Sequence, residues 1–136
     1  MLYKDLNLKV NEDVVYTTIN GKEIQVKQYL PIKDKNDLIE IALQKSKENN
    51  VYNEIKLDMY FNLNIILLYT DLAFTPEELE DEMKLYDELQ SNDVFLSVIG
   101  AMKEEEYDSL LDYLKIMKGA NETHDRSAAA MLKTFT

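Results

Sequence analysis

The dipeptide Asn20-Gly21 is the feature that most narrowly limits how this chain can fold. Type I′ turns need a positive φ at both central residues, which Asn tolerates and Gly adopts without steric cost. β-branched and aromatic residues fill positions 14–19 before the turn. After the turn, Ile24 and Val26 alternate with polar residues, which is the pattern of a strand with one buried face. The segment therefore predicts a β-hairpin with its turn at this dipeptide.

An isolated hairpin is only marginally stable in water, so one of its faces or edges must pack against something else. Leu6, Leu8 and Val10 also alternate with polar residues, and they supply a candidate third strand. We therefore expect residues 1–30 to form a region of two or three strands that packs on the rest of the chain.

The rest of the chain, residues 34–136, is predicted to be an acidic helical body. Its first helix can be capped by Asp34 or Asn36 and is expected to run to about Asn49. A second helix is expected from Asn53 to Tyr69. This helix is apolar around most of its circumference, which is typical of a helix at the centre of a bundle.

The sequence FTPEELEDE carries a clear helix start. Thr75 is suited to the N-cap position, Pro76 to the first helical position, and Glu78 completes a capping box with Thr75. The acidic run 77–82 therefore lies at the positive end of a helix dipole, where carboxylates are stabilising. We expect this helix to continue to about residue 90.

The remaining helices follow in close succession. One is expected to start at Asn92 or Asp93, and another at residues 103–106, ending at Gly119. A final segment begins near Thr123. We therefore predict one mainly helical α+β domain that spans the whole chain, with an N-terminal hairpin of two or three strands packed on five or six helices.

The net charge of −11 is unevenly distributed. Residues 71–113 hold 14 acidic and 2 basic side chains, whereas residues 1–70 hold 10 acidic and 9 basic side chains. Binding to a phosphate backbone needs Lys or Arg to displace counterions, so we expect no nucleic-acid partner. The acidic part suits solvated helix faces or a basic protein partner.

The sequence carries no membrane signal. Its longest uncharged apolar run, residues 59–70, is too short to span a bilayer. Met1 begins a polar stretch rather than the basic and then apolar leader of a signal peptide. We therefore expect a soluble protein with no membrane contact.

No catalytic, cofactor or metal site is expected. Cysteine is absent, His124 is the only histidine, and three glycines cannot build a phosphate-binding loop. The acidic residues show neither the Glu-x-x-His motif of di-iron bundles nor the spacing of an EF-hand. We therefore predict a non-enzymatic protein that uses no cofactor and works through protein–protein interaction.

The segment NGKEIQVKQYLPIKDKNDLIEIAL, followed by an acidic helical body, resembles the tail assembly chaperones of phages and prophages of Gram-positive bacteria. The likeness covers residues 14–43 and the overall layout. These chaperones commonly open with a strand pair of the form NGKEY and continue into a helical domain of about this size. The resemblance implies a phage protein of virion assembly in the host cell cytoplasm. Such a protein coats the helical tape-measure protein and helps to recruit tail-tube subunits.

Partner binding is expected at both ends of the chain. The hairpin edge can offer backbone hydrogen bonds to another copy or to a client strand, although the hairpin can also serve only as a lid on the bundle. The last ten residues keep an apolar face without a cap or a polar tail, so we expect the native chain or its assembly to continue past Thr136. The candidate partner-binding residues are Tyr16, Thr18, Ile24, Val26, Met131, Leu132 and Phe135.

Two other interpretations of the sequence stay open. The chain could be a different head or tail component of the phage particle, such as a connector. It could also be an acidic phage-encoded inhibitor that mimics nucleic acid or blocks a basic host defence protein. A chaperone or a connector is expected to self-associate, whereas a mimic is more often a monomer or a dimer.

Overall fold

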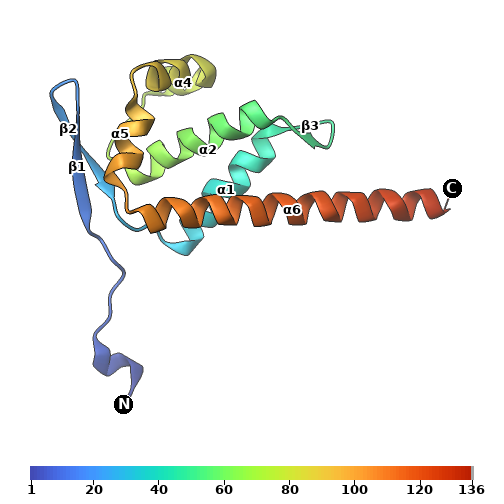
Figure 1. The fold of residues 1–136 in the computed structure, drawn as a ribbon, viewed down its shortest axis with the longest axis horizontal. Helices are drawn as coiled ribbons and strands as arrows, with labels where there is room; N and C mark the ends of the chain where they lie inside the picture. The colour runs from blue at the N-terminus through green and yellow to red at the C-terminus, as the bar shows by residue number, and fades with distance from the viewer. Residues whose placement is uncertain (136) are drawn as a thin grey trace.

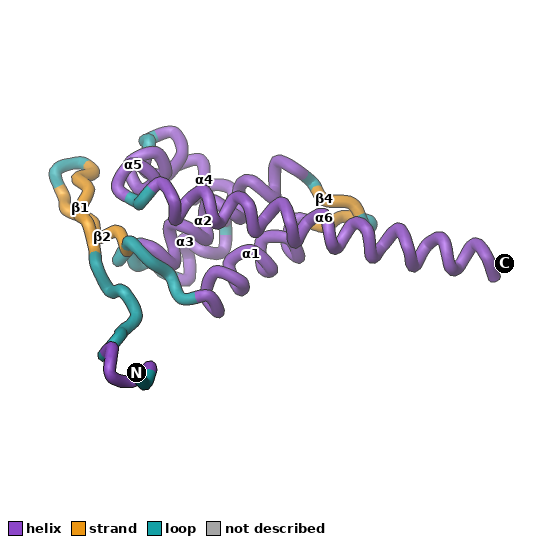
Figure 2. Tube along the Cα trace, turned by 60° about the horizontal axis from the view of Figure 1, so that its bottom comes forward, coloured by secondary structure: helices purple, strands orange, loops and turns teal. Residues whose placement is uncertain are grey.

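The computed structural model describes the backbone of residues 1–135 and the side chains of residues 1–122. Within these residues it confirms a mainly helical α+β fold, with an N-terminal two-stranded hairpin, a helical body and a small second hairpin (Figure 1). The two hairpins lie at opposite ends of the helical body (Figure 2). The α-helices are α1 (Ile32–Ser46), α2 (Glu54–Tyr69), α3 (Pro76–Glu80), α4 (Glu82–Ser91), α5 (Val94–Ala101) and α6 (Glu104–Phe135).

The first hairpin has the predicted turn. Strands β1 (Val14–Ile19) and β2 (Lys22–Lys27) pair antiparallel around Asn20 and Gly21, whose φ angles are 51° and 75°. Ile24 and Val26 face the body and are buried, so the hairpin contributes part of the core. Type I′ geometry is therefore confirmed, with one face of the ribbon packed on the helices.

The predicted third strand is wrong. Leu6 lies in a short 3-10 helix, η1 (Tyr3–Leu6), and Leu8 and Val10 lie in a segment without regular structure. In a sheet, alternation stabilises a strand only where a neighbouring strand is paired with it, and β1 pairs with β2 alone within the described residues. The segment instead leads away from the body (Figures 1 and 2).

The first body helix starts and ends earlier than expected. Pro31 holds the N-cap position of α1, where Asp34 or Asn36 was expected, and Ser46 is its last residue. The helix stops there because the chain enters a second hairpin, in which β3 (Lys47–Glu48) pairs with β4 (Val51–Tyr52).

The turn of this second hairpin is Asn49-Asn50. The φ angles of these two residues are 51° and 66°, so both lie in the left-handed region that type I′ turns require. Asn reaches this region more easily than most residues, and two of them in sequence cannot easily continue a helix. The sequence-based expectation of a helix up to Asn49 is therefore corrected.

Helix α2 has the central position that its composition predicts. Asn53 caps it by accepting a hydrogen bond from the backbone N–H of Lys56 at 3.1 Å. Its two amide side chains are satisfied, since Asn62 donates to the hydroxyl of Tyr86 and Asn64 donates to the backbone carbonyl of Leu38. Its buried residues are Leu57, Met59, Phe61, Leu63, Ile65, Ile66 and Tyr69.

The capping box of α3 is present, but the helix is shorter than expected. The backbone N–H of Thr75 donates to the Glu78 carboxylate at 2.8 Å, and Thr75 in turn accepts from Glu78. The helix breaks at Asp81, whose carboxylate caps the start of α4 by accepting from the N–H of Lys84 at 3.1 Å. The single helix expected over this region is therefore two, because a second capping residue interrupts the first helix.

Helix α6 runs past Gly119 to Phe135, so the predicted helix end at Gly119 and the separate final segment are both wrong. Within the described residues, Gly21 is the only glycine with a positive φ. A glycine ends a helix by adopting the left-handed conformation, and otherwise it costs only about 1 kcal/mol in a helix interior. The C-terminal half of α6 extends beyond the rest of the body (Figure 1).

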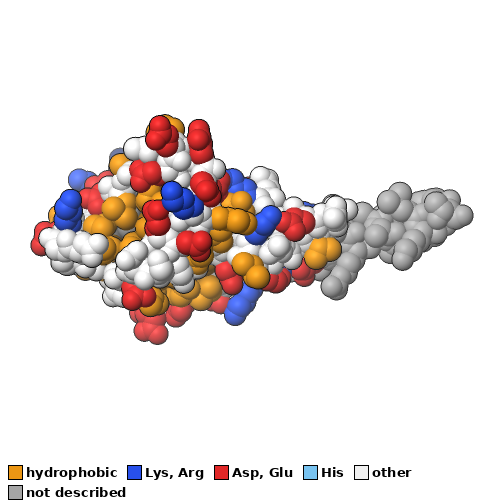
Figure 3. All heavy atoms as spheres, turned by 90° about the horizontal axis from the view of Figure 1, so that it is seen from above, with side chains coloured by type: hydrophobic (Ala, Val, Ile, Leu, Met, Phe, Trp, Pro, Cys, Tyr) orange, Lys and Arg blue, Asp and Glu red, His pale blue; other side chains and the backbone are white. Residues whose placement is uncertain are grey.

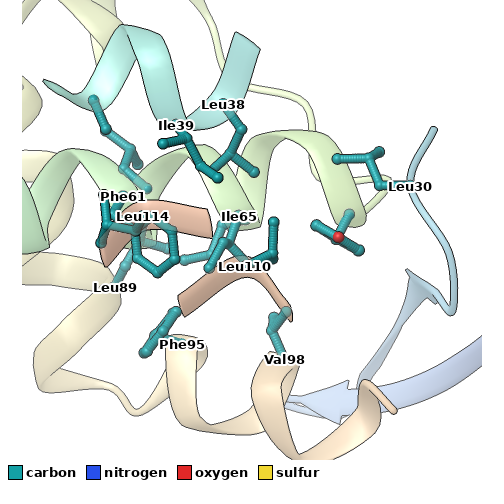
Figure 4. Packing of buried hydrophobic residues seen from close by; sticks show 14 of the residues in the cluster. Leu30, Leu38, Ile39, Phe61, Ile65, Leu89, Phe95, Val98, Leu110 and Leu114 are labelled. Atoms are coloured by element: carbon teal, nitrogen blue, oxygen red, sulfur yellow. The ribbon is translucent and has the colours of Figure 1, made fainter. Parts of the chain in front are cut away.

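Side chains from the first hairpin and from all the α-helices except α3 meet in one hydrophobic cluster. Figure 4 shows Leu38 and Ile39 of α1, Ile65 of α2, Phe95 of α5 and Leu110 of α6 converging on it. Phe95 also contacts Tyr107 edge to face, with 6.4 Å between ring centroids. The cluster fixes α6 beside α1, and these two helices form the walls of the surface described next.

Candidate protein-binding surfaces

A surface hollow of about 270 Å³ lies between α1 and α6. Its lining is mainly apolar, with Ile32 and Ile39 on α1 and Tyr113 and Met117 on α6. Ile32 and Tyr113 remain exposed, and the neighbouring Ile116 is 66% exposed. We call this hollow, with the exposed side chains beside it, the α1–α6 groove.

Helical periodicity explains why the groove is apolar on both walls. Leu110 and Leu114 form the stripe of α6 that is buried in the core. Tyr113, Ile116 and Met117 follow one another at the i, i+3 and i+4 spacing of a second stripe, next to the first. The apolar face of α6 is therefore wider than its contact with the body, and part of it stays uncovered.

The groove continues toward the second hairpin. A further hollow of about 240 Å³ shares Met117 and is lined by polar residues including Glu40 and Gln44. At this end Asn121 donates a hydrogen bond to the hydroxyl of Tyr52, with 3.1 Å between the two atoms. The surface along α6 thus changes from apolar to polar toward the second hairpin.

A buried polar cluster holds the two walls of the groove together. The carboxylate oxygen Oε1 of Glu106 accepts hydrogen bonds from the backbone N–H of Leu30 at 3.0 Å and from the hydroxyl of Tyr69 at 2.8 Å. It also forms an ion pair with the ammonium of Lys35 at 3.0 Å, and that ammonium lies 4.3 Å from the ring centroid of Tyr29. We call Lys35, Tyr69 and Glu106, with the backbone of Leu30, the Glu106 cluster.

The Glu106 cluster is structural chemistry rather than a reactive site. Burial raises the pKa of the Tyr69 hydroxyl, and the hydrogen bond to Glu106 raises that pKa further. Tyr69 therefore stays protonated and acts as a hydrogen-bond donor. Among the described side chains, no buried nitrogen or oxygen lacks a hydrogen-bond partner. The cluster joins the end of the first hairpin, α1, α2 and α6, and it sets the position of α1 beside α6.

Gln28 strengthens the same junction. Its buried side-chain amide donates to the backbone carbonyl of Ala101 at 2.8 Å and to that of Val26 at 3.2 Å. The end of α5 is therefore tied to the end of β2. Lys35, Glu106 and Gln28 were not predicted as buried contact residues, because charged and amide side chains in acidic helices and at strand ends are normally exposed.

The structure separates the four predicted binding residues of the hairpin. Tyr16 and Thr18 lie on its exposed outer face, and the Tyr16 hydroxyl accepts a hydrogen bond from the side chain of Gln25 at 3.2 Å. Ile24 and Val26 are buried against the helices, at 7% and 0% exposure. Any partner of the hairpin therefore meets its outer face or its edge, not the side chains of β2 that pack on the core.

The three predicted binding residues at the chain end are Met131, Leu132 and Phe135. Their backbone belongs to α6, and their side chains lie outside the described residues. The backbone of His124 also belongs to α6, and its side chain also lies outside the described residues. The residues of the α1–α6 groove were not predicted as binding residues, although the spacing of Tyr113, Ile116 and Met117 is visible in the sequence.

The acidic stretch around the α3–α4 junction serves mainly to start helices. A hollow of about 340 Å³ there is lined by four carboxylates and by Lys84 and Leu85. Hydrogen bonds from Thr75 lower the pKa of the Glu78 carboxyl, and Asp81 caps α4. On the face shown in Figure 3, acidic side chains alternate with basic, polar and hydrophobic ones instead of forming one continuous field.

The described residues contain neither a candidate metal site nor a candidate membrane-spanning helix. No group of three or more His, Cys, Asp or Glu side chains within them could hold a metal ion. Within the same part of the chain, no helix is both long and apolar enough to cross a membrane. Comparison of the chain with protein-family models, with curated protein sequences and with solved structures found no match.

Proposed function

We propose that this chain is a non-enzymatic phage or prophage protein of virion assembly, a tail assembly chaperone that holds a helical segment of the tape-measure protein. The single observation that carries this proposal is the α1–α6 groove, whose two helical walls expose apolar side chains that the chain's own core does not cover. An amphipathic helix can place its own apolar residues into such a groove at i, i+3, i+4 and i+7.

Two further features support the proposal. The sequence resemblance of residues 14–43 to tail assembly chaperones supplies the biological class. The acidic Glu40, which lines the hollow next to the groove, would repel acidic surfaces and favour a client with basic flanks. Such a chaperone works in the host cell cytoplasm before the tail is complete, with other phage structural proteins as partners.

The proposal can be tested with a photo-crosslinking amino acid placed in the groove. We would substitute Tyr113 or Ile116 in cells that produce the phage and identify the captured proteins by mass spectrometry. Ile55, which is 83% exposed at the start of α2, provides a control position away from the groove. We expect the tape-measure protein or tail-tube subunits at the groove positions only.

Other captured partners would contradict the proposal in different ways. Capture of a host nucleic-acid-binding or defence protein would favour the acidic inhibitor. Capture of head or connector proteins would favour another component of the particle. As a functional readout, Ile116→Asp should lower the yield of tailed particles, whereas Ile55→Asp should leave that yield unchanged. Both side chains are exposed, so neither substitution disturbs the core.

A further inference from the structure

The N-terminal segment, residues 1–13, mixes polar and apolar side chains, and its apolar side chains are exposed. Its last residues, 10–13, border the body in a hollow that Tyr29 and Pro31 also line. Leu8 and Val10 are 65% and 62% exposed, and no residue of η1 is buried. The segment leaves the hairpin at the start of β1 and runs away from the helices (Figures 1 and 2). We call this segment the N-terminal arm. Exposed apolar side chains in sequence on an extended arm usually mark a contact that the isolated chain does not make.

Strand β1 has an outer edge with unpaired backbone groups. The two-residue turn makes Ile19 and Lys22 a hydrogen-bonded pair, and such pairs alternate with non-hydrogen-bonded ones along an antiparallel ladder. Tyr16, opposite Gln25, is therefore in a non-hydrogen-bonded pair, and its N–H and C=O point away from β2. The N–H of Gln25 confirms that Tyr16 and Gln25 form a non-hydrogen-bonded pair. It points outward on the other edge of the hairpin, away from β1, and donates to the Asp71 carboxylate at 2.9 Å.

The outer edge of β1 lacks the features that normally protect an edge strand. Residues 14–19 contain no charged side chain and no proline. In the described part of the chain, β1 has no strand neighbour other than β2. The other edge of the hairpin is partly covered, by Asp71 and by a bridge between Val26 and Thr70. Helix α5 packs against β1, but no backbone hydrogen bond joins the two within the described residues. An uncharged edge with unpaired backbone groups is a template for pairing with another strand.

The arm and the edge match each other in register. The β1 residues with outward backbone groups are Val14, Tyr16 and Thr18, all at even positions, and Leu6, Leu8 and Val10 of the arm are also at even positions. Two copies related by a two-fold axis beside Glu12 would place Leu8 opposite Tyr16 and Val10 opposite Val14. Opposed residues in an antiparallel pair share one face of the sheet, so these side chains would meet on the exposed outer face of the hairpin.

We propose that two copies of this chain form a dimer by exchanging their N-terminal arms, each arm adding a strand to the outer edge of the other copy's β1. The inference is independent of the proposed function. A second copy is the occupant because each arm leads beyond the start of β1, away from its own edge (Figures 1 and 2). A two-fold exchange covers both arms and both edges at once, whereas a foreign strand on the edge would leave both arms uncovered.

The first test is the mass of the full chain in solution, measured by size-exclusion chromatography with light scattering. We expect a dimer, and we expect the double variant Leu8→Asp/Val10→Asp to be a monomer with unchanged helical circular dichroism, because both side chains are exposed and outside the core. Tyr16→Pro should have the same effect, since it removes one outward N–H and no hydrogen bond to β2. Ile55→Asp is the matched control and should remain dimeric. A monomeric wild type, or a dimer that persists in the arm variants, would overturn the proposal.

The second test fixes the register. The chain has no cysteine, so a Leu8→Cys chain can be mixed with a tagged Tyr16→Cys chain and oxidised without interference. Residues opposite each other in a hydrogen-bonded pair lie about 5.5 Å apart between Cα atoms, which a disulfide can bridge. We expect a disulfide-linked product containing both chains, and none when Ile55→Cys replaces Leu8→Cys. Equal cross-linking in the two mixtures would show that the arm does not lie on this edge.

Discussion

At the scale of single residues, Glu106 holds α6 against α1 and α2 through its buried carboxylate. One carboxylate oxygen receives a backbone N–H, a phenol and an ammonium, and these groups come from different parts of the chain. Replacing a whole buried ion pair with apolar side chains can be neutral, because the gain in attraction barely exceeds the cost of removing both charges from water. Removing one partner is different, because the other charge stays buried and unpaired.

We therefore predict that Glu106→Ala lowers the free energy of unfolding by about 3–5 kcal/mol, since it leaves the buried Lys35 ammonium without its counterion. Urea unfolding followed by circular dichroism measures this change. Glu105→Ala is the matched control on the preceding, exposed residue and should change stability by less than about 0.5 kcal/mol. Adding Lys35→Met to Glu106→Ala should recover part of the loss. Equal effects at positions 105 and 106 would show that the ion pair is not buried as described.

At the scale of elements, the two hairpins show what local sequence can and cannot predict. The first was predictable because Asn20-Gly21 is flanked by strands long enough to show alternation. The second has a comparable turn at Asn49-Asn50, but two-residue strands are too short to show a period. The arm carries the alternation of a strand at Leu8 and Val10 without a strand neighbour, which local pattern alone cannot reveal.

The candidate binding surface was less predictable than the elements themselves. Burial of Ile24 and Val26 depends on which face of the hairpin meets the helices. The alternation in β2 shows that one face is buried, but not that the helices cover it completely. The α1–α6 groove depends on two helices that are far apart in sequence, since its lining residues Ile32 and Tyr113 are 81 positions apart. Spacing predicts each apolar stripe but not which stripe remains uncovered after packing.

Helix α6 yields a prediction of its own, because Gly119 lies inside it and not at its end. We expect Gly119→Ala to raise the free energy of unfolding by about 0.5–1 kcal/mol, since alanine loses less backbone freedom than glycine on forming a helix. A Cβ at this position would meet nothing within 4 Å. Thermal unfolding and helical ellipticity measure the change. Gly21→Val is the contrasting variant and should lower the free energy of unfolding, because residue 21 has a φ of +75°, which strains a β-branched side chain. Destabilisation by Gly119→Ala would instead indicate that the helix ends there.

At the scale of the whole molecule, a single core joins the hairpin to the helices. The cluster contains Val26 of β2, Ile66 of α2 and Leu110 of α6, each with no exposed surface. The groove depends on this core, because α1 and α6 contact each other directly and both contribute side chains to the cluster. The exposed apolar side chains of the groove are therefore presented by a packed body and are not signs of incomplete folding.

Two isoleucines on α2 can be used to test whether a single core supports both the hairpin and the helices. Ile66→Ala should lower the free energy of unfolding by about 2–5 kcal/mol, because it removes buried methyl groups and leaves a cavity. Ile55→Ala, on the exposed first turn of α2, should have an effect below about 0.5 kcal/mol. Far-ultraviolet circular dichroism reports the helices, and tyrosine signals report the packing around them. The two signals should shift together in Ile66→Ala, because one cluster supports both. Separate transitions would mean that the hairpin and the helices are stabilised by different cores, and the proposed groove would then lose its fixed geometry.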